Sequence, residues 1–354
     1  MSCGERIRAA RKIAGLSQQN LADHVPVTKQ SISKYERDEA MPGSEVLLAI
    51  ARTLQVPVDF FLRGRPMPRL TEPAYRAHHT KLRKRDLDSV QAQVREWLER
   101  YLELEQILPR ACQRKWSLPP HLPRATGDLE ESELAAEALR EEWALGEDPI
   151  ESMVAVLEDR GVKVMEMDGP KSFDGLAFWA EKTPVIVYGG EAPGDRQRFS
   201  MAHKLAHLLL ERGEDEDPEK VATRFAGAFL LPERRLIGEI GRERSNLGIR
   251  ELQILKHKYG MSMQAIIYRA HDLEVISDYV TKKLFRTFSA RGWRKEEPGR
   301  PVRRETPLRM EQMAAMVLAE DALSRSRVAE LLGRDVQAVA TSSGADDEIT
   351  AGSS

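Results

Sequence analysis

Two histidines four residues apart are the side chains in this sequence best placed for metal chemistry. His203 and His207 lie in an apolar-rich run, residues 199–210, whose spacing predicts a helix with a buried face. Positions i and i+4 of a helix project from the same side, so both imidazoles point in one direction. This is the arrangement of the zinc-binding His-Glu-x-x-His helix. The residue that follows the first histidine, a glutamate in that motif, is Lys204 here.

Lys204 changes the chemistry that the two histidines can support. The glutamate of the motif is not a ligand, because its task is to take a proton from the metal-bound water. A lysine is cationic at neutral pH, repels the metal, and accepts no proton until its pKa has fallen by several units. Loss of a positioned general base typically costs about 10²–10⁴ in rate. We therefore expect a metal site that contains no catalytic residue at the base position.

Length and composition predict a multidomain, soluble, cytoplasmic protein. The chain has 354 residues, of which 41% are hydrophobic and 31% charged, and its formal net charge is only −2. A basic surface for nucleic acid must therefore be local. Cys3 and Cys112 have no metal-binding spacing, which suits a reducing cytosol. Neither a signal peptide nor a run of about 18 apolar residues is seen, so we expect no membrane contact.

A second group of side chains has the chemistry to read DNA. Residues 16–36 predict two short helices, with Ser17 and Thr28 placed to cap their N-termini. Apolar residues can fill the space between these helices and leave an outward polar face on the second one. Glutamine on such a face pairs with adenine in the major groove. Gln18, at the start of the first helix, is placed to meet a phosphate. The residues predicted to face the groove are Lys29, Gln30, Ser31 and Lys34.

This segment resembles the Xre-type, or phage-repressor-like, helix-turn-helix. The resemblance covers about sixty residues, including the pair Tyr35-Glu36 and the trailing apolar helix near residues 46–54. It implies a five-helix domain over residues 4–64 that binds double-stranded DNA, with a homodimer on paired half-sites. Pro26 stands where the family usually has glycine, so the turn must close without a left-handed residue. A helix pair that only packs, without binding DNA, is the alternative.

A basic stretch follows this domain. Residues 65–85 hold seven Lys or Arg against Glu72 alone, a formal charge of +6. They can add phosphate contacts that strengthen affinity without sequence specificity, or they can form a solvated linker. Helical spacing of apolar residues over 86–108 predicts a long helix next. We therefore place a basic linker and long helix at 65–110.

Residues 173–298 resemble the ImmA/IrrE family of metallopeptidase domains, which are often fused behind an Xre-type helix-turn-helix. The resemblance rests on Ala202-His-Lys-Leu-Ala-His207, on residues 219–226 and on Leu230-Leu-Pro232. It implies an α+β zincin-like domain, here placed at 125–298, with zinc held by His203, His207 and Glu219. Two imidazoles and one carboxylate leave a fourth position for water, the pattern of a catalytic zinc site.

The remaining pattern predicts a mainly α, multidomain fold with a small three-stranded sheet. Strand signals appear only in the short runs 162–165, 176–180 and 185–188. Helical spacing predicts further helices near 131–145 and 150–160. It also predicts a C-terminal helical segment at 300–336 that includes one long helix, 311–332. We expect the last residues, 337–354, to be a disordered tail. The Met-rich stripe of the C-terminal segment is either core or a dimer surface.

Three interpretations of the peptidase-like domain stay open. It can be a working peptidase that uses another carboxylate, such as Glu211 or Glu214. It can bind zinc without catalysis and act as a sensor. It can also have lost the metal and serve folding or a protein partner. We favour a sequence-specific DNA-binding regulator with a non-catalytic second domain. The alternatives are an active zinc endopeptidase that cleaves a repressor-type partner and an antitoxin-like autoregulator.

Overall fold

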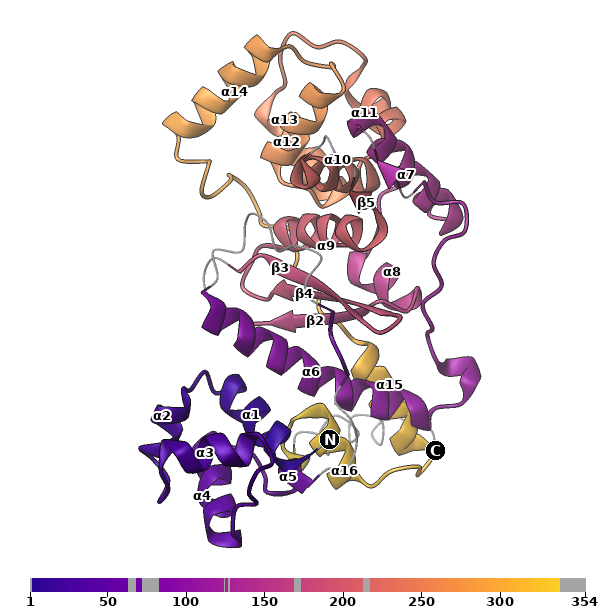
Figure 1. Cartoon of the computed structure of the whole chain (residues 1–354). Helices are drawn as coiled ribbons and strands as arrows, with labels where there is room; N and C mark the ends of the chain where they lie inside the picture. Colours follow the sequence, from indigo (N-terminus) through magenta and orange to yellow (C-terminus); the bar gives the residue numbers. More distant parts are fainter. Residues whose placement is uncertain are drawn as a thin grey trace, which may run out of the picture. The chain divides into compact units, whose positions relative to one another are not determined.

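The chain folds into two compact units, seen here in a computed structural model (Figure 1). Unit 1 comprises Met1–Leu70, His79–Gln113 and Leu308–Ser354, and unit 2 comprises Thr71–His78 and Arg114–Pro307. The structure describes residues 2–62, 68–71, 83–123, 125–126, 128–168, 173–212 and 217–337. Among these residues, no helix has both the length and the apolar character needed to span a bilayer. All but the first residue of the predicted tail 337–354 and most of the basic stretch 65–85 lie outside the described residues.

Unit 1 begins with a cluster of short helices, as predicted. These are α1 (Cys3–Ile13), α2 (Gln18–Ala22), α3 (Lys29–Glu36), α4 (Ser44–Leu54) and α5 (Asp59–Leu62). Ser17 and Thr28 cap α2 and α3, since their hydroxyls accept the amides of Asn20 and Ser31. The apolar faces meet in a core built around Ile7, Leu21, Ile32, Ile50 and Phe61.

The turn between α2 and α3 closes around Pro26 without a left-handed residue. The amide of Val27 donates to the carbonyl of Val25 over 2.7 Å, which makes a three-residue turn centred on the proline. Such an inverse γ-turn needs a central φ near −75°, close to the value that the proline ring imposes. The departure from the usual glycine therefore has a local physical solution.

The long helix α6 (Lys84–Ile107) anchors the rest of unit 1. Arg6 of α1 makes a buried bidentate pair with Glu99 of α6, at 2.7 and 3.1 Å. The C-terminal half of α6 packs through Tyr101 and Leu104 against α15 (Arg309–Ala319) and α16 (Arg325–Leu332). A short 3-10 helix, η1 (Arg110–Cys112), follows α6.

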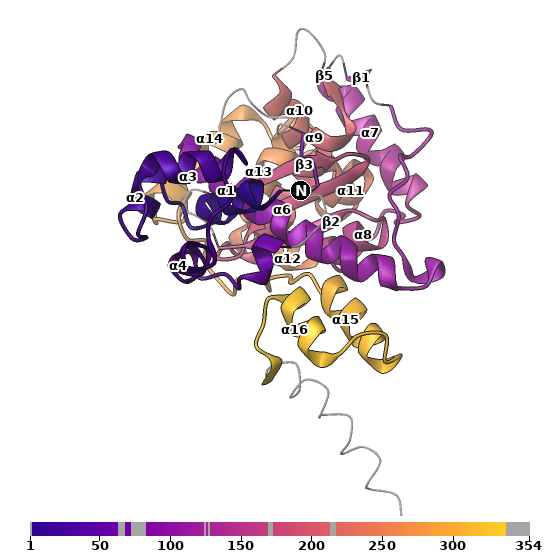
Figure 2. The same ribbon diagram turned by 60° about the horizontal axis from the view of Figure 1, so that its bottom comes forward.

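The prediction of one long C-terminal helix at 311–332 is wrong. Figure 2 shows α15 and α16 as two separate short helices. Between them, Asp321 adopts a left-handed backbone with φ 51°, which ends the first helix. Ser324 then caps the second helix, because its hydroxyl accepts the amide of Arg327. Both helices pack on α6 of unit 1, so the segment shares a core with the long helix.

Unit 2 contains the predicted three-stranded sheet. Its strands are β2 (Lys163–Met167), β3 (Gly175–Ala180) and β4 (Thr183–Gly189), in the order β2-β4-β3. β2 runs parallel to β4, and β3 runs antiparallel to it. Two-residue strands β1 (Ala125–Thr126) and β5 (Glu211–Arg212) also pair, in parallel. They were not predicted, because two residues are too few to show alternation.

Helices cover this sheet in layers. α9 (Gly194–Leu209) lies along the sheet and contacts β3 and β4, and α10 (Pro218–Leu230) packs on α9 (Figure 1). The other helices of the unit are α7 (Leu129–Glu142), α8 (Met153–Asp159), α11 (Glu233–Ile240), α12 (Ile249–Tyr259), α13 (Met263–Asp272) and α14 (Asp278–Ala290). One continuous apolar core runs through these layers and includes Met201, Leu205, Phe225 and Phe229. The packed pair α9 and α10 carries the predicted metal ligands.

Candidate metal centre and nucleic-acid interface

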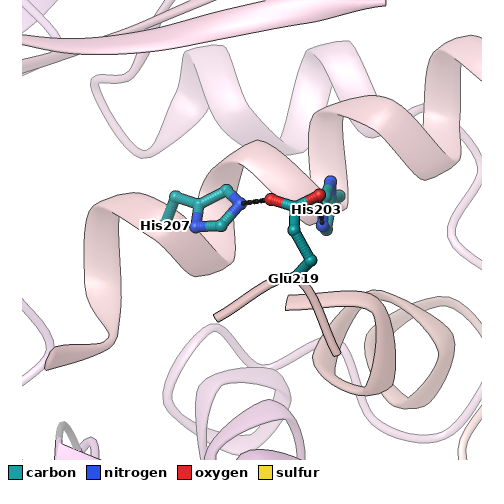
Figure 3. Close-up of side chains that lie close together, drawn as sticks. All are labelled: His203, His207 and Glu219. Carbon is teal, nitrogen blue, oxygen red and sulfur yellow. Dashed lines mark hydrogen bonds and ion pairs between the residues drawn. The ribbon is translucent and has the colours of Figure 1, made fainter. Parts of the chain in front are cut away.

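The two packed helices α9 and α10 bring the predicted metal ligands together (Figure 3). His203 and His207 lie one turn apart on α9, and Glu219 lies on the first turn of α10. Asp217 fixes that turn, because its carboxylate accepts the amide of Glu219 over 3.0 Å. Nε2 of His207 donates to Oε1 of Glu219 over 3.0 Å, and Nε2 of His203 lies 3.6 Å from Oε2. All three ligand atoms lie within 4.8 Å of one another.

The donor set fits a zinc ion on two further grounds. Nε2 of His203 is buried and has no hydrogen-bond partner among the described residues, which leaves a polar atom to be satisfied. Burial lowers the pKa of His203 to about 3, and the charges of Lys204 and His207 add to that effect. Burial also lowers the pKa of His207. Both imidazoles are therefore neutral at pH 7, the form that binds zinc.

Lys204 lies beside these ligands on α9. It is partly buried, and burial lowers the pKa of its ammonium, while the nearby carboxylates of Glu219 and Asp174 act in the opposite direction. The ammonium is thus electrostatically coupled to the same carboxylate that would bind the metal. A positive charge at this place competes with a metal cation for Glu219.

No further carboxylate joins the three ligands in the described part of the chain. Glu211, one of the two alternative bases, is an exposed residue of the short strand β5. Glu214, the other one, lies outside the described residues. The metal-binding roles of His203, His207 and Glu219 remain predictions that this geometry supports.

A cavity of about 610 Å³ in unit 2 has wall residues one helical turn from two of the predicted metal ligands. Phe199 and Thr223 lie in its wall, one helical turn from His203 and Glu219 respectively. Apolar surface from Phe199 and Tyr268 is combined there with the guanidinium groups of Arg224 and Arg294. The second unit therefore offers space for a small ligand beside the predicted zinc ligands.

The predicted DNA-reading face lies on α3. Lys29, Gln30 and Lys34 are exposed, while Ile32 is fully buried in the core. Ser31 is only partly exposed, and its hydroxyl lies 3.0 Å from that of Thr28 at the helix cap. The structure therefore presents one glutamine and two lysines freely, with the serine closer to the cap.

A buried ionic network that sequence analysis missed fixes α3 against α1 and α2. The guanidinium of Arg11 binds both carboxylate oxygens of Glu36, at 2.5 and 2.9 Å. The side-chain amide of Gln18 donates to the same carboxylate over 2.8 Å. Arg11 also donates to the backbone carbonyl of Leu16 over 2.7 Å. Gln18 thus has a positioning role besides its predicted phosphate contact. The only signal in the sequence was the polar Glu36 on an apolar helix face.

Comparison with known families finds one known domain in each unit. Residues 7–61 match the helix-turn-helix family, and residues 157–271 match the IrrE N-terminal-like domain, a peptidase family. The chain carries a helix-turn-helix domain and an IrrE N-terminal-like domain. Both resemblances seen in the sequence are confirmed, and so is the mainly α fold with a small sheet.

Curated relatives match the helix-turn-helix region. Repressor protein C2 of Salmonella phage P22 is 41% identical over 76 residues, 22% of this chain and 34% of the relative. The SPbeta prophage-derived uncharacterized regulator YonR of Bacillus subtilis is 39% identical over 61 residues, 17% of this chain and 56% of that protein. The regulator ImmR of the same species is 34% identical over 62 residues, 18% of this chain and 49% of ImmR. The chain thus spans between a third and just over half of these relatives.

Among solved structures, the SHP pheromone receptor Rgg2 of Streptococcus dysgalactiae aligns with 94% of this chain and 99% of the receptor, at 13% identity. The TM-score is 0.16, so this likeness carries no argument about fold or function.

Proposed function

We propose that the protein is a sequence-specific DNA-binding transcriptional regulator that acts as a homodimer. The observation that carries this proposal is the exposed face of α3, where Gln30 stands between Lys29 and Lys34. Glutamine pairs with adenine through two hydrogen bonds, and lysine binds guanine or phosphate. The buried network of Arg11 and Glu36 holds α3 rigidly enough to enter the major groove.

The relatives support the same conclusion. The matched region contains α1 to α5, and the proteins that match there carry the names of a phage repressor and of helix-turn-helix regulators. Dimers of such domains bind half-sites about one helical turn apart, about 34 Å. We expect the operator of this protein to show the same two-fold symmetry.

We further propose that unit 2 is a metal-binding sensor or scaffold that does not hydrolyse peptides. His203, His207 and Glu219 would hold zinc, which acts as a Lewis acid and lowers the pKa of a bound water. The proton of that water needs an acceptor, and the residue beside the ligands is Lys204. Its ammonium cannot serve as a base, and its positive charge lowers the affinity of the site for the metal. The cavity lined by Phe199 and Thr223 supports a sensing role, because it can admit a small ligand.

One observation favours a second candidate function, an active zinc endopeptidase that cleaves a repressor-type partner. Nε2 of His203 is buried without a hydrogen-bond partner in the described structure, as expected for a metal ligand. This observation supports metal binding but supplies no base. It therefore ranks below the non-hydrolytic assignment.

In vitro selection from random duplexes tests the DNA-binding proposal. The wild-type protein should enrich a two-fold symmetric sequence and prefer it to a scrambled duplex at fixed salt. Gln30→Ala/Lys34→Ala should lose that preference, at about 1–3 kcal/mol for each base contact removed. Ile254→Ala, an exposed change in unit 2, is a matched control that should retain it. Failure to enrich any sequence, or full preference in the double variant, would refute the proposal.

A further inference from the structure

We infer that α6, which lies outside the matched helix-turn-helix residues 7–61, completes the DNA-binding surface of unit 1. A cavity between α1, α2, α3 and the first turns of α6 binds a phosphate of the DNA backbone. This inference rests on the proposed function and adds to it a contact that the helix-turn-helix alone does not provide.

The lining of this cavity is strongly basic. It has a volume of about 520 Å³ and includes five cationic side chains against two acidic ones. The lining residues are Arg8, Arg11, Lys12, Gln18, Ser33, Glu36, Arg37, Lys84 and Asp88. The formal charge of the lining is therefore +3, from five cations less two carboxylates.

Much of that charge has no local counterion. Glu36 neutralises Arg11, and Asp88 lies 3.3 Å from the ammonium of Lys12. Across the described residues of unit 1, Arg8 and Lys84 make no ion pair, and both are exposed. A cavity with two uncompensated cations attracts an anion.

Arg95 of α6 adds to this imbalance. It is a second arginine close to Arg8, and Asp88 is the acid that acts on it. Burial lowers the pKa of Arg95, and the charge of Arg8 acts in the same direction. Nε of Arg95 is buried without a hydrogen-bond partner in the described structure. The two guanidinium groups repel each other, and Asp88, which also pairs with Lys12, offsets only part of the local positive charge.

The first turns of α6 are fixed in place by contacts with α1. The bidentate pair between Arg6 and Glu99 is almost entirely buried, with side-chain exposures of 0% and 5%. The hydroxyl of Ser89, the residue that follows Asp88, donates to the carbonyl of Ile13 over 3.2 Å. The basic end of α6 is thus held beside α1 by interactions that do not involve DNA.

The position of the cavity identifies the anion as the DNA backbone. Ser33 and Arg37 line it from α3, the helix that carries Gln30, and Gln18 lines it from the start of α2. A helix that reads bases lies close to the flanking phosphates, which provide most contacts in protein–DNA interfaces. An anion in this cavity therefore lies where the backbone passes when α3 occupies the groove. A free phosphate ion shares this chemistry, and the experiment must distinguish it.

The test is the salt dependence of DNA binding by the full chain. In the variant Arg8→Gln/Lys84→Gln, the plot of the logarithm of the DNA association constant against log salt should become less steep. The magnitude of its negative slope should fall by about 1 to 2, since each lost phosphate contact removes about 0.9. The loss should be equal on the selected duplex and on a scrambled duplex, because phosphates carry no sequence. Arg110→Gln/Arg325→Gln removes the same charge from exposed positions of unit 1 outside the cavity and should leave the slope near that of the wild type.

The outcomes separate this inference from the proposed function. An unchanged slope in Arg8→Gln/Lys84→Gln, with a normal thermal unfolding curve, overturns the phosphate site while leaving base reading intact. An equal loss in both double variants also overturns it, because the effect would then be general charge. Protection by inorganic phosphate alone, at constant ionic strength and with no change in slope, assigns the cavity to a free anion and overturns it too. If the wild type shows no sequence preference, the proposed function fails first, whatever the slope.

Discussion

Two small clusters of polar and charged side chains, one in each unit, differ in whether every polar atom has a hydrogen-bond or ion-pair partner. We call the cluster in unit 1 matched and the cluster in unit 2 unmatched. In unit 1, Glu36 faces Arg11 and Gln18, and its two carboxylate oxygens are both occupied. In unit 2, Glu219 lies between two neutral imidazoles and within the field of the Lys204 ammonium, and Nε2 of His203 has no hydrogen-bond partner in the described structure. A matched cluster positions helices, whereas an unmatched one leaves a polar atom for a ligand. The comparison explains why the first cluster serves structure and the second one is a candidate metal centre.

The largest expected effect comes from breaking the matched cluster. Glu36→Ala leaves the buried guanidinium of Arg11 without its carboxylate and should lower the free energy of unfolding of unit 1 by about 3–5 kcal/mol. DNA binding should fall with it, because α3 loses its anchor. Urea denaturation followed by circular dichroism measures the change. Glu39→Ala is the matched control, since its pair with Arg37 is half exposed and is worth at most about 1 kcal/mol. Equal effects in both variants would contradict the distinction.

The substitution Lys204→Glu tests how the charge at position 204 affects metal binding in unit 2. Replacing the ammonium by a carboxylate removes a repulsion of the metal and adds an attraction. One pair of unit charges about 5 Å apart interacts by about 3 kcal/mol at an effective dielectric constant of 20, and this exchange alters more than one such pair. Zinc affinity should therefore rise by at least about 100-fold, as measured by competition with a chelating dye. Lys220→Glu makes the same charge change at an exposed position of α10 and should have a much smaller effect. A weaker zinc affinity in Lys204→Glu would refute the electrostatic account of this site.

The unmatched cluster also predicts a pH dependence of stability. Folding lowers the pKa of His203 from 6.5 to about 3, so near pH 5 the unfolded chain binds a proton there and the folded chain does not. The stability from this group is therefore fully present above pH 6.5 and is lost as the pH falls. Metal-free wild-type protein should lose about 2 kcal/mol more than His203→Gln between pH 7.5 and pH 5. Parallel unfolding curves for the two proteins would show that the imidazole is not desolvated.

The smallest of these effects concerns the helix cap of α3. The hydroxyl of Thr28 accepts the amide of Ser31 over 3.2 Å, so Thr28→Ala should destabilise unit 1 by about 1 kcal/mol. Thr53→Ala is a useful control, because that hydroxyl only donates to the carbonyl of Ala49 within α4. Thermal unfolding compares the two variants. A larger loss in Thr53→Ala than in Thr28→Ala would contradict the proposed cap.

Local patterns in the sequence predicted much of the fold and part of the site. The caps Ser17 and Thr28 marked α2 and α3, and β-branched and aromatic runs marked the sheet. Such signals act over a few residues, so they can be read in one dimension. The break at Asp321 was missed, because the apolar spacing continues on both sides of it. The short pair β1 and β5 has no periodicity at all.

Contacts between distant segments could not be predicted in the same way. The packing of α15 and α16 on α6 joins residues more than two hundred positions apart, for example Arg100 and Leu331. The approach of Glu219 to His207 was expected only through the family resemblance, since no spacing rule places a carboxylate twelve residues on. The pair of Arg11 and Glu36 was missed for the same reason. Pairing of buried charges depends on tertiary contacts that a helical pattern does not specify.

The most direct test of the central claim is peptide hydrolysis by the zinc-loaded, full-length wild-type protein. Incubation with a diverse peptide library, read by mass spectrometry with and without a chelator, would detect cleavage at any sequence. A site whose base position holds Lys204 should produce no cleavage beyond that seen with His203→Ala. Chelator-sensitive products that disappear in His203→Ala would contradict the account and would make unit 2 an active peptidase.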